Sequence, residues 1–164
     1  VMADWRNKSD PVSRIVRRVF SFANDHTGYG LGVDGQEPFS VIQYLHGQEY
    51  RPHCDGQCYG GAYRKGERIA TSLTYCAVAD KGGYTMFTRH GLKVVPKKRQ
   101  MLFFGYKLPP RSEGEPPTMD DGHTEHTGCP LRRGKKWIAT MWYREGVTAE
   151  KNWEYYSRRG SQGV

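Results

Sequence analysis

A histidine and an aspartate stand two residues apart in the segment QEYRPHCDG, which spans residues 48–56. Side chains at positions i and i+2 of an extended strand point to the same face. We therefore expect His53 and Asp55 to project together into whatever that face covers. An imidazole and a carboxylate placed in this way can form two corners of a metal site. The alternative is a surface loop in which the H-x-D spacing is accidental.

A third ligand has two candidates, His123 and His126, which both stand beside a predicted strand. Two histidines and one carboxylate that leave open positions are typical of non-haem Fe(II) sites. In the strand predicted for residues 135–143, Lys136 shares a face with Ile138. A lysine on the inner face of a barrel is costly unless a counter-charge meets it, and an anionic ligand would do so. The alternative is an edge-strand lysine that faces water.

Four cysteines leave the redox state of the chain open. Cys54, Cys58, Cys76 and Cys129 allow none, one or two disulfides, and their spacing does not choose between these states. Cys54 and Cys58 beside His53 raise zinc as an alternative, but a C-x-x-x-C pair without a matching second pair is poor zinc spacing. By strand parity Cys54 points away from the metal, so we do not count it as a ligand.

The chain of 164 residues is long enough for one domain with a hydrophobic core, and we expect a single domain over residues 1–164. It carries 25 Lys and Arg against 17 Asp and Glu, a formal charge of +8. We interpret the scattered positive charge as general surface charge, with nucleic-acid binding as the alternative, since no basic helix or nucleic-acid motif accompanies it.

No apolar run of membrane-spanning length and no signal peptide is visible.

Short β-prone segments dominate the predicted secondary structure. A helix is predicted from Pro11 to about Ala23, because Ser9-Asp10-Pro11 is a helix start and apolar residues then recur at helical spacing. Strands are predicted at residues 39–45, 68–78, 84–88, 92–95, 101–104 and 135–143. Residues 56–67 contain four glycines and predict a long, mobile loop, which is either a lid or an inert surface loop. This pattern favours a β-sandwich or jelly roll with one flanking helix.

Several blocks of the sequence resemble, in family order, the catalytic domain of prolyl 4-hydroxylases. That family consists of Fe(II)- and 2-oxoglutarate-dependent dioxygenases with a mainly β, double-stranded β-helix (jelly-roll) fold and a flanking N-terminal helix. The matching blocks are PVSRIVRRVFSF, VIQYLHGQEYRPHCD, GERIATSLTYCAV with GGYTMF and GLKVVPKKRQMLFF, and DDGHTEHTGCPLRRGKKWIATMW. The family's domain usually has a further strand and helix upstream, which leaves open whether this chain is a fragment.

The resemblance implies roles for individual residues. It makes His53, Asp55 and His126 the iron ligands, with His126 preferred over His123 because it stands ten residues before the lysine. Lys136 would pair with the distal carboxylate of 2-oxoglutarate. Tyr44, Thr85 and Trp142 match positions that line the cosubstrate pocket, while Tyr50 and Arg68 match positions that face the peptide, Arg68 being counted among the catalytic residues.

The implied reaction is the 4-hydroxylation of peptidyl proline, with release of succinate and CO2. Its cofactors are Fe(II), 2-oxoglutarate and L-ascorbate, and its partner is a proline-containing peptide or protein. Such a substrate is extended and would suit an aromatic groove of Tyr50, Tyr59, Tyr63 and Trp142. The alternative is that these aromatic residues belong to the core. A lysine at position 136 points to the collagen-type and plant or algal-type enzymes, and the resemblance favours the endoplasmic reticulum lumen. The alternatives are the same chemistry on another side chain, such as lysine, and a non-catalytic structural or binding subunit.

Overall fold

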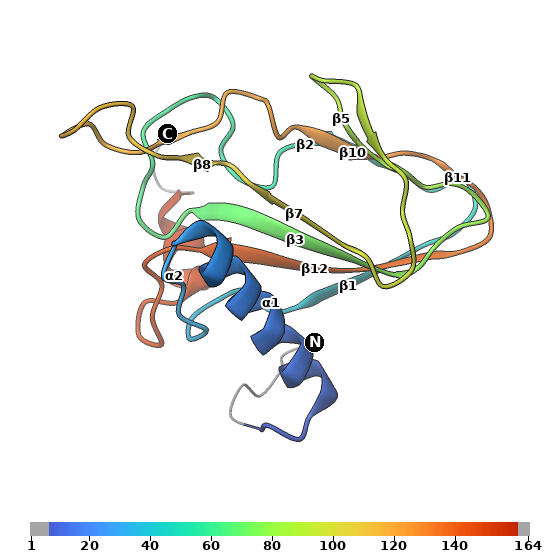
Figure 1. Cartoon of the computed structure of the whole chain (residues 1–164), viewed down its shortest axis with the longest axis horizontal. Coiled ribbons are helices and arrows are strands. Elements are labelled where there is room, and N and C mark those ends of the chain that lie inside the picture. Colours follow the sequence, from blue (N-terminus) through green and yellow to red (C-terminus); the bar gives the residue numbers. More distant parts are fainter. Residues whose placement is uncertain (1–6, 161–164) are drawn as a thin grey trace.

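Two facing antiparallel sheets and one long helix make up most of the domain, as the computed structural model of residues 7–160 shows (Figure 1). The major sheet has the order β1-β12-β3-β7, from Ser40–Tyr44, Lys136–Arg144, Arg68–Ala77 and Met101–Gly105. The minor sheet has the order β2-β10-β5-β6, from Tyr50–His53, His126–Gly128, Thr85–Phe87 and Leu92–Val94. The expected mainly β architecture with a flanking helix is confirmed.

Smaller elements complete the chain. Two short ladders pair β11 with β4 and β8 with β9, from Leu131–Arg133, Lys81–Gly82, Lys107–Leu108 and Thr118–Met119. The helices are α1, Pro11–Thr27, and α2, Trp153–Gly160. Among the residues described, neither helix is long and apolar enough to cross a membrane.

Helix α1 begins where the sequence predicts and ends four residues later than predicted. The Asp10 side chain accepts a hydrogen bond of 2.8 Å from the Ser13 backbone N–H, which caps the first turn. The last turn closes at Gly28, whose φ of 69° lies in the left-handed region that glycine adopts without strain. The apolar spacing fades after Ala23, so the prediction stopped there, whereas the glycine cap sets the observed end.

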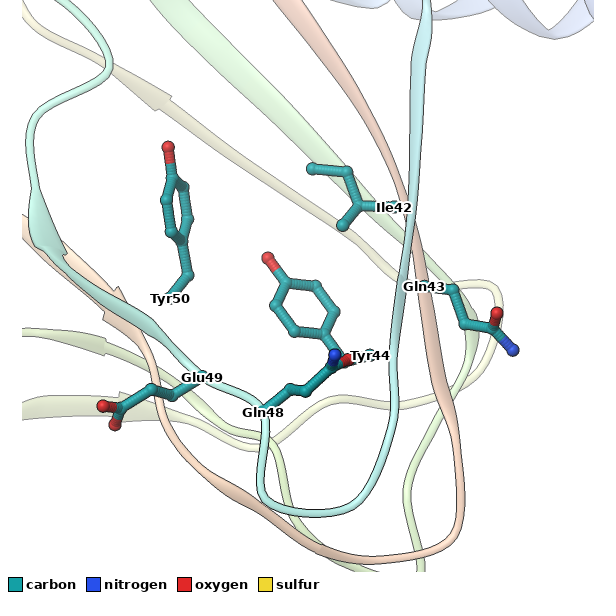
Figure 2. A pocket seen from close by; sticks show the side chains of 6 residues that line it. All are labelled: Ile42, Gln43, Tyr44, Gln48, Glu49 and Tyr50. Carbon is teal, nitrogen blue, oxygen red and sulfur yellow. The ribbon is translucent and has the colours of Figure 1, made fainter.

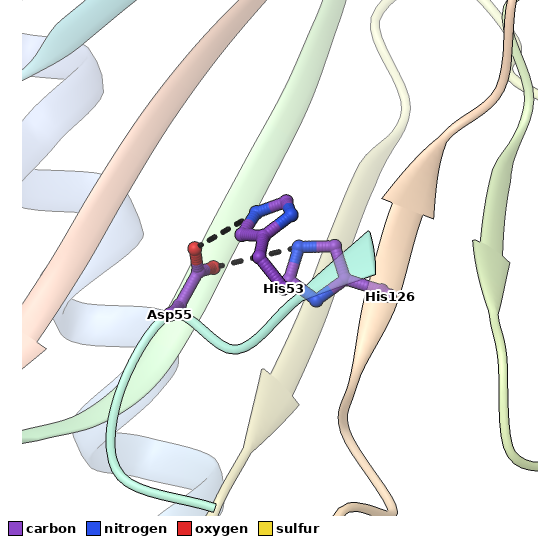
Figure 3. A group of neighbouring side chains, drawn as sticks. All are labelled: His53, Asp55 and His126. Carbon is purple, nitrogen blue, oxygen red and sulfur yellow. Dashed lines mark ion pairs between the residues drawn. The ribbon is translucent and has the colours of Figure 1, made fainter. Parts of the chain in front are cut away.

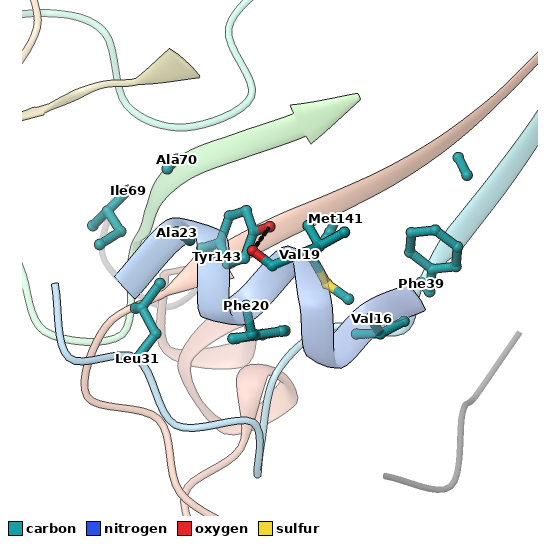
Figure 4. Packing of buried hydrophobic residues seen from close by; sticks show 11 residues of the cluster. Val16, Val19, Phe20, Ala23, Leu31, Phe39, Ile69, Ala70, Met141 and Tyr143 are labelled. Atoms are coloured by element: carbon teal, nitrogen blue, oxygen red, sulfur yellow. Dashed lines mark hydrogen bonds between the residues drawn. The ribbon is translucent and has the colours of Figure 1, made fainter. Parts of the chain in front are cut away.

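The apolar face of α1 packs on the outer face of the major sheet (Figure 4). Val16, Phe20 and Ala23 of the helix meet Met141 and Tyr143 of β12, all of them buried. Burial of this kind contributes roughly 25 cal/mol per Å² of apolar surface. The helix therefore fixes the sheet from outside and leaves the space between the two sheets for other side chains.

Alternation along β12 follows the predicted parity. Met141 and Tyr143 belong to the helix-side cluster, whereas Ile138 packs with Tyr44 in a second cluster between the sheets. Lys136, two residues before Ile138, is buried and lies over the Tyr44 ring. Because side chains alternate along a strand, Lys136 and Ile138 lie on the same face of β12, the face toward the minor sheet.

The loop of residues 56–67, predicted to be mobile, is tied to the segment that ends in β9. The backbone N–H of Gly60 donates to the Asp120 carbonyl at 3.0 Å, and that of Met119 donates to the Gly61 carbonyl at 2.8 Å. An isolated bridge joins Ala62 to Thr118. The two irregular segments therefore form one joined wall rather than a free loop.

Candidate metal centre

His53, Asp55 and His126 converge between the two sheets (Figure 3). One ligand atom from each side chain lies within 4.8 Å of the other two. His53 Nε2 is 3.6 Å from Asp55 Oδ1, and His126 Nε2 is 3.7 Å from Asp55 Oδ2. The carboxylate thus faces both imidazoles, and the donor set is the two-histidine, one-carboxylate combination that suits Fe(II).

Strand pairing explains how the two histidines meet. His53 ends β2, His126 begins β10, and the two residues are partners in the antiparallel register. Asp55 lies in a bend after the end of β2. The prediction that strand parity brings Asp55 beside His53 was therefore wrong in its reason, although the two side chains do meet.

Backbone carbonyls orient both imidazoles. His53 Nδ1 lies 2.7 Å from the Arg51 carbonyl, and His126 Nδ1 lies 2.9 Å from the Thr124 carbonyl. A carbonyl only accepts, so each Nδ1 carries a proton, and Nε2 is the ring atom that faces Asp55. In the neutral form of each ring, Nε2 would then be free to bind a metal. This tautomer is the one that a metal ion between the three side chains requires.

Burial and charge act against each other on the titratable groups of the site. Burial favours a higher pKa for the Asp55 carboxyl, but the His53 hydrogen bond, the charge of His126 and the 2.7 Å hydrogen bond from Thr71 together lower that pKa below its usual value. Burial lowers the pKa of His126. Burial also acts to lower the pKa of His53, but its hydrogen bonds to Asp55 and to the Arg51 carbonyl raise that pKa above its usual value. The cluster therefore favours an ionised Asp55 carboxylate, which is the form that binds a metal.

A buried acidic residue that the sequence analysis did not single out anchors the wall beside Asp55. The Glu37 carboxylate accepts hydrogen bonds of 2.6 Å from Arg68 Nε, Arg68 Nη2 and Arg144 Nε. Arg68 also donates to the Asp55 backbone carbonyl at 3.0 Å and stacks 4.1 Å above the Trp142 ring. Glu37 falls in a polar segment without periodicity, so no local signal identifies it.

Arg68 is thus occupied within the protein, and its predicted contact with a peptide stays a prediction. Its guanidinium satisfies Glu37 and Asp55 and covers Trp142. The Trp142 indole N–H is buried and makes no hydrogen bond of standard geometry in the described part of the chain, but it lies near enough to the Asp55 carboxylate to help lower the pKa of that group. Trp142 therefore lies beside the proposed metal ligand Asp55.

Lys136 lies on the major sheet without an acidic partner among residues 7–160. Its ammonium donates to the Gly83 carbonyl at 3.1 Å and stands 4.4 Å from the ring of Tyr44, its partner in the β1–β12 register. Burial lowers the pKa of Lys136 to about 8. Thr85, also buried, accepts a 2.8 Å hydrogen bond from the Tyr75 hydroxyl. These surroundings suit a bound anion.

A cavity of about 470 Å³ opens between β1 and the segment that enters β2 (Figure 2). Tyr44 and Tyr50 both point into it, and the Tyr50 ring lies 3.8 Å from the His53 ring. Its lining residues are Ile42, Gln43, Tyr44, Gln48, Glu49 and Tyr50. The cavity is large enough for a small dicarboxylate and lies against the histidine side of the cluster.

Of the remaining predicted positions, some lie near the cluster of His53, Asp55 and His126 and others lie away from it. His123 lies away from the cluster, where its Nδ1 is 2.9 Å from Nε2 of His90. Tyr59 is 83% exposed, whereas the Tyr63 hydroxyl donates to the Glu145 carbonyl and its ring packs against the core. The structure therefore brings Tyr50 and Trp142 toward the cluster, while Tyr63 is partly buried and packs against the core.

Comparison with known proteins gives a consistent result. A family model described as 2OG-Fe(II) oxygenase superfamily matches residues 39–144. The chain is 36% identical, over 81% of its length, to prolyl 4-hydroxylase subunit alpha-1 of Gallus gallus, and 32% identical, over 84%, to probable prolyl 4-hydroxylase 8 of Arabidopsis thaliana. It covers 25% and 50% of these two relatives, so it spans a quarter to a half of their lengths.

A solved structure extends the comparison to the fold. The viral collagen prolyl hydroxylase of Paramecium Bursaria Chlorella virus-1, crystallised with 2OG, superposes with a TM-score of 0.66 at 29% identity. The match covers 82% of this chain and 72% of that one. It confirms the double-stranded β-helix expected from the sequence.

Proposed function

The chain belongs to the 2OG-Fe(II) oxygenase superfamily, and we propose that it 4-hydroxylates proline in a peptide or protein, with Fe(II), 2-oxoglutarate and L-ascorbate as cofactors. The observation that carries the proposal is the convergence of His53, Asp55 and His126. The resemblance to prolyl 4-hydroxylases of a bird and a plant supports proline as the substrate.

His53, Asp55 and His126 hold the metal in this proposal. Their Nε2 atoms and carboxylate face a common point, and the carbonyls of Arg51 and Thr124 keep both imidazoles in the required tautomer. When bound, iron and 2-oxoglutarate supply the oxidising chemistry, in which O2 is consumed, succinate and CO2 are released and the proline ring is hydroxylated. The protein contributes placement and a water-poor site.

Lys136 binds the distal carboxylate of 2-oxoglutarate in the same proposal. Its ammonium is buried on the sheet that faces the histidines, and its only described hydrogen-bond acceptor is the Gly83 carbonyl. An anion would supply the missing counter-charge, and a charge-assisted hydrogen bond of this kind is roughly twice as strong as a neutral one. Tyr44 lies beside the ammonium, and Thr85 and Trp142 complete the set that we assign to the cosubstrate pocket.

The peptide approaches over Tyr50 in this proposal. The Tyr50 side chain is 49% exposed and its ring lies against His53, so an extended chain bound on it would pass close to the metal. A proline-rich segment is already in an extended polyproline conformation and loses little entropy on binding. Arg68 and Trp142 form the opposite wall of this approach.

The proposal is tested by turnover of a polyproline peptide with Fe(II), 2-oxoglutarate and ascorbate. Succinate is quantified together with peptide hydroxylation by mass spectrometry. His53→Ala, with a metal ligand removed, serves as the inactive control, and His46→Ala, an exposed histidine outside the cluster, serves as the matched active control. We expect iron-dependent hydroxyproline only with the wild type and His46→Ala.

Two outcomes separate the parts of the proposal. A folded protein without any iron-dependent turnover would contradict the enzyme assignment and favour a non-catalytic binding subunit. Consumption of 2-oxoglutarate without hydroxyproline would retain the superfamily chemistry and remove proline as the substrate. Omission of ascorbate tests its role separately, because we expect the rate to fall as iron leaves the ferrous state.

A further inference from the structure

A disulfide between Cys54 and Cys58 closes a small ring of backbone around Asp55. Cys54 stands between the two residues that face the metal position, and Asp55 lies inside the ring. Cys76 and Cys129 are free cysteines. Of the disulfide patterns that the sequence left open, the structure contains the one that surrounds a proposed metal ligand.

Asp55 needs such a constraint because the sheet does not hold it. β2 ends at His53, and Asp55 lies in the bend that follows. His126 and His53, by contrast, are fixed by the β2–β10 ladder. The carboxylate must nevertheless stay within reach of both imidazoles, so its backbone has to be restrained by other means.

The size of the ring indicates a local role. The stabilisation that a disulfide gives to the whole fold grows with the length of the loop that it closes, and a ring of residues 54–58 lies at the low end of that scale. The same short ring strongly restricts the backbone of the residues inside it. The disulfide is therefore better suited to fixing Asp55 than to stabilising the domain as a whole.

The ring is also fitted against the wall of the site. A Cβ added to Gly56 would lie 2.5 Å from Cε2 of Tyr106 and 2.9 Å from the Arg68 carbonyl, so the backbone approaches both closely. Arg68 donates to the Asp55 carbonyl from this same wall, and Thr71 donates to the carboxylate. The disulfide and these contacts therefore restrain the same turn.

We propose that the Cys54–Cys58 disulfide is a positioning element for the metal ligand Asp55, and that metal affinity falls when the disulfide is reduced. The inference rests on the proposed function of the His53, Asp55 and His126 site. Reduction by a phosphine breaks the S–S bond and yields two thiols, while water supplies two hydrogens to the thiols and its oxygen to the phosphine oxide. Asp55 then loses one of its restraints without any change in the ligand set.

The test compares Mn²⁺ binding, as a redox-stable stand-in for Fe(II), by isothermal titration calorimetry under anaerobic conditions. Cys54→Ser with Cys58→Ser removes the ring, and Cys76→Ser is the matched control at an exposed free cysteine. We expect about tenfold weaker Mn²⁺ binding in the double variant, the usual scale for residues that support metal ligands. Cys76→Ser should bind as the wild type does, and the apo unfolding temperature of the double variant should change little.

Reduced wild-type protein gives an independent measurement if the double variant does not fold. After treatment with tris(2-carboxyethyl)phosphine and anaerobic gel filtration, we expect the same loss of Mn²⁺ affinity, with recovery on reoxidation. Equal affinity of the oxidised protein and of either folded, ring-opened form would overturn the inference, as would free thiols at Cys54 and Cys58 in the purified protein. Wild-type protein that binds no Mn²⁺ at all would contradict the proposed function itself.

Discussion

The major and minor sheets differ in the interactions that stabilise them. β3 and β12 of the major sheet are ten and nine residues long, pair with each other along their length and are backed by α1. The strands of the minor sheet are three or four residues long, and its β2–β10 ladder shifts register between His126 and Gly128. Apolar burial dominates the first sheet, whereas side-chain hydrogen bonds support the second.

The division corresponds to a division of chemical tasks. The minor sheet carries His53 and His126, and the turn that follows β2 carries Asp55. The major sheet carries Lys136. The Thr127 hydroxyl donates a hydrogen bond of 2.7 Å to the Tyr50 carbonyl and so joins β10 to β2. Such side-chain hydrogen bonds add to the few backbone hydrogen bonds of these short strands. We infer that mutations in the minor sheet affect metal binding, and that core mutations in the major sheet affect folding.

The largest expected effect comes from His126→Ala. Loss of a proposed metal ligand should lower kcat/KM by about a thousandfold or more, since metal catalysis contributes several kcal/mol. His126 is buried against Phe87 and Phe104, so its truncation also removes packing, and the unfolding temperature is measured to show that the variant is folded in the assay. His123→Ala, three residues away and outside the cluster, is the matched control and should retain activity. Equal losses in both variants would contradict the assignment of His126.

Met141→Ala tests the opposite side of the comparison. Met141 of β12 is fully buried against α1, and truncation of such a side chain costs about 2–5 kcal/mol of the free energy of unfolding. The dissociation constant of 2-oxoglutarate for the folded protein should not change. Leu92→Ala, at a side chain that is 58% exposed, serves as the control in the same denaturant titration. A changed cosubstrate affinity in Met141→Ala would show that the two regions are coupled.

Lys136→Met should separate cosubstrate binding from stability within the major sheet. A hydrogen bond to a charged group contributes about 1.5–3 kcal/mol, so we expect about tenfold to a hundredfold weaker 2-oxoglutarate binding. Removal of a buried charge without an acidic partner should leave the free energy of unfolding unchanged or raise it. Lys135→Met, at the exposed neighbouring position, should change neither quantity. Calorimetric titration and thermal unfolding together distinguish these outcomes.

The smallest expected effect is a dependence on pH. Burial lowers the pKa of Lys136 to about 8, so the cation that we assign to 2-oxoglutarate binding is lost as the pH rises above that value. The dissociation constant should then rise by up to about tenfold per pH unit. Between pH 8 and the ordinary lysine pKa the unfolded chain binds more protons, so the contribution of Lys136 to stability rises with pH. Lys136→Arg, which stays charged, should abolish this dependence.

Local patterns in the sequence predicted the regular parts of the fold. Alternation in residues 135–143 placed Lys136 and Ile138 on one inner face, because a period of two does not depend on distant residues. The capping signal at Asp10 likewise placed the start of α1. The choice between His123 and His126 could not be made from such patterns and depended on the family resemblance.

Contacts between distant segments were not predictable from local patterns. Glu37, Arg68 and Arg144 come from three separate parts of the chain and meet only after the sheet has formed. The Cys54–Cys58 disulfide was one of several possibilities that spacing does not distinguish. The pairing of His53 with Asp55 was expected for a strand and occurs in a turn, because the ring and the Arg68 contact replace the ladder.

The position of β12 in the major sheet has a consequence for how the protein is made. This strand comes last among the strands in sequence, yet it lies between β1 and β3, where Ser40 pairs with Thr140. The sheet cannot close until β12 has been synthesised, and such long-range pairing is slow to form. Until then β1 and β3 present open edges, which favour aggregation. Fragments that end before Lys136 should therefore misassemble rather than fold into a smaller domain.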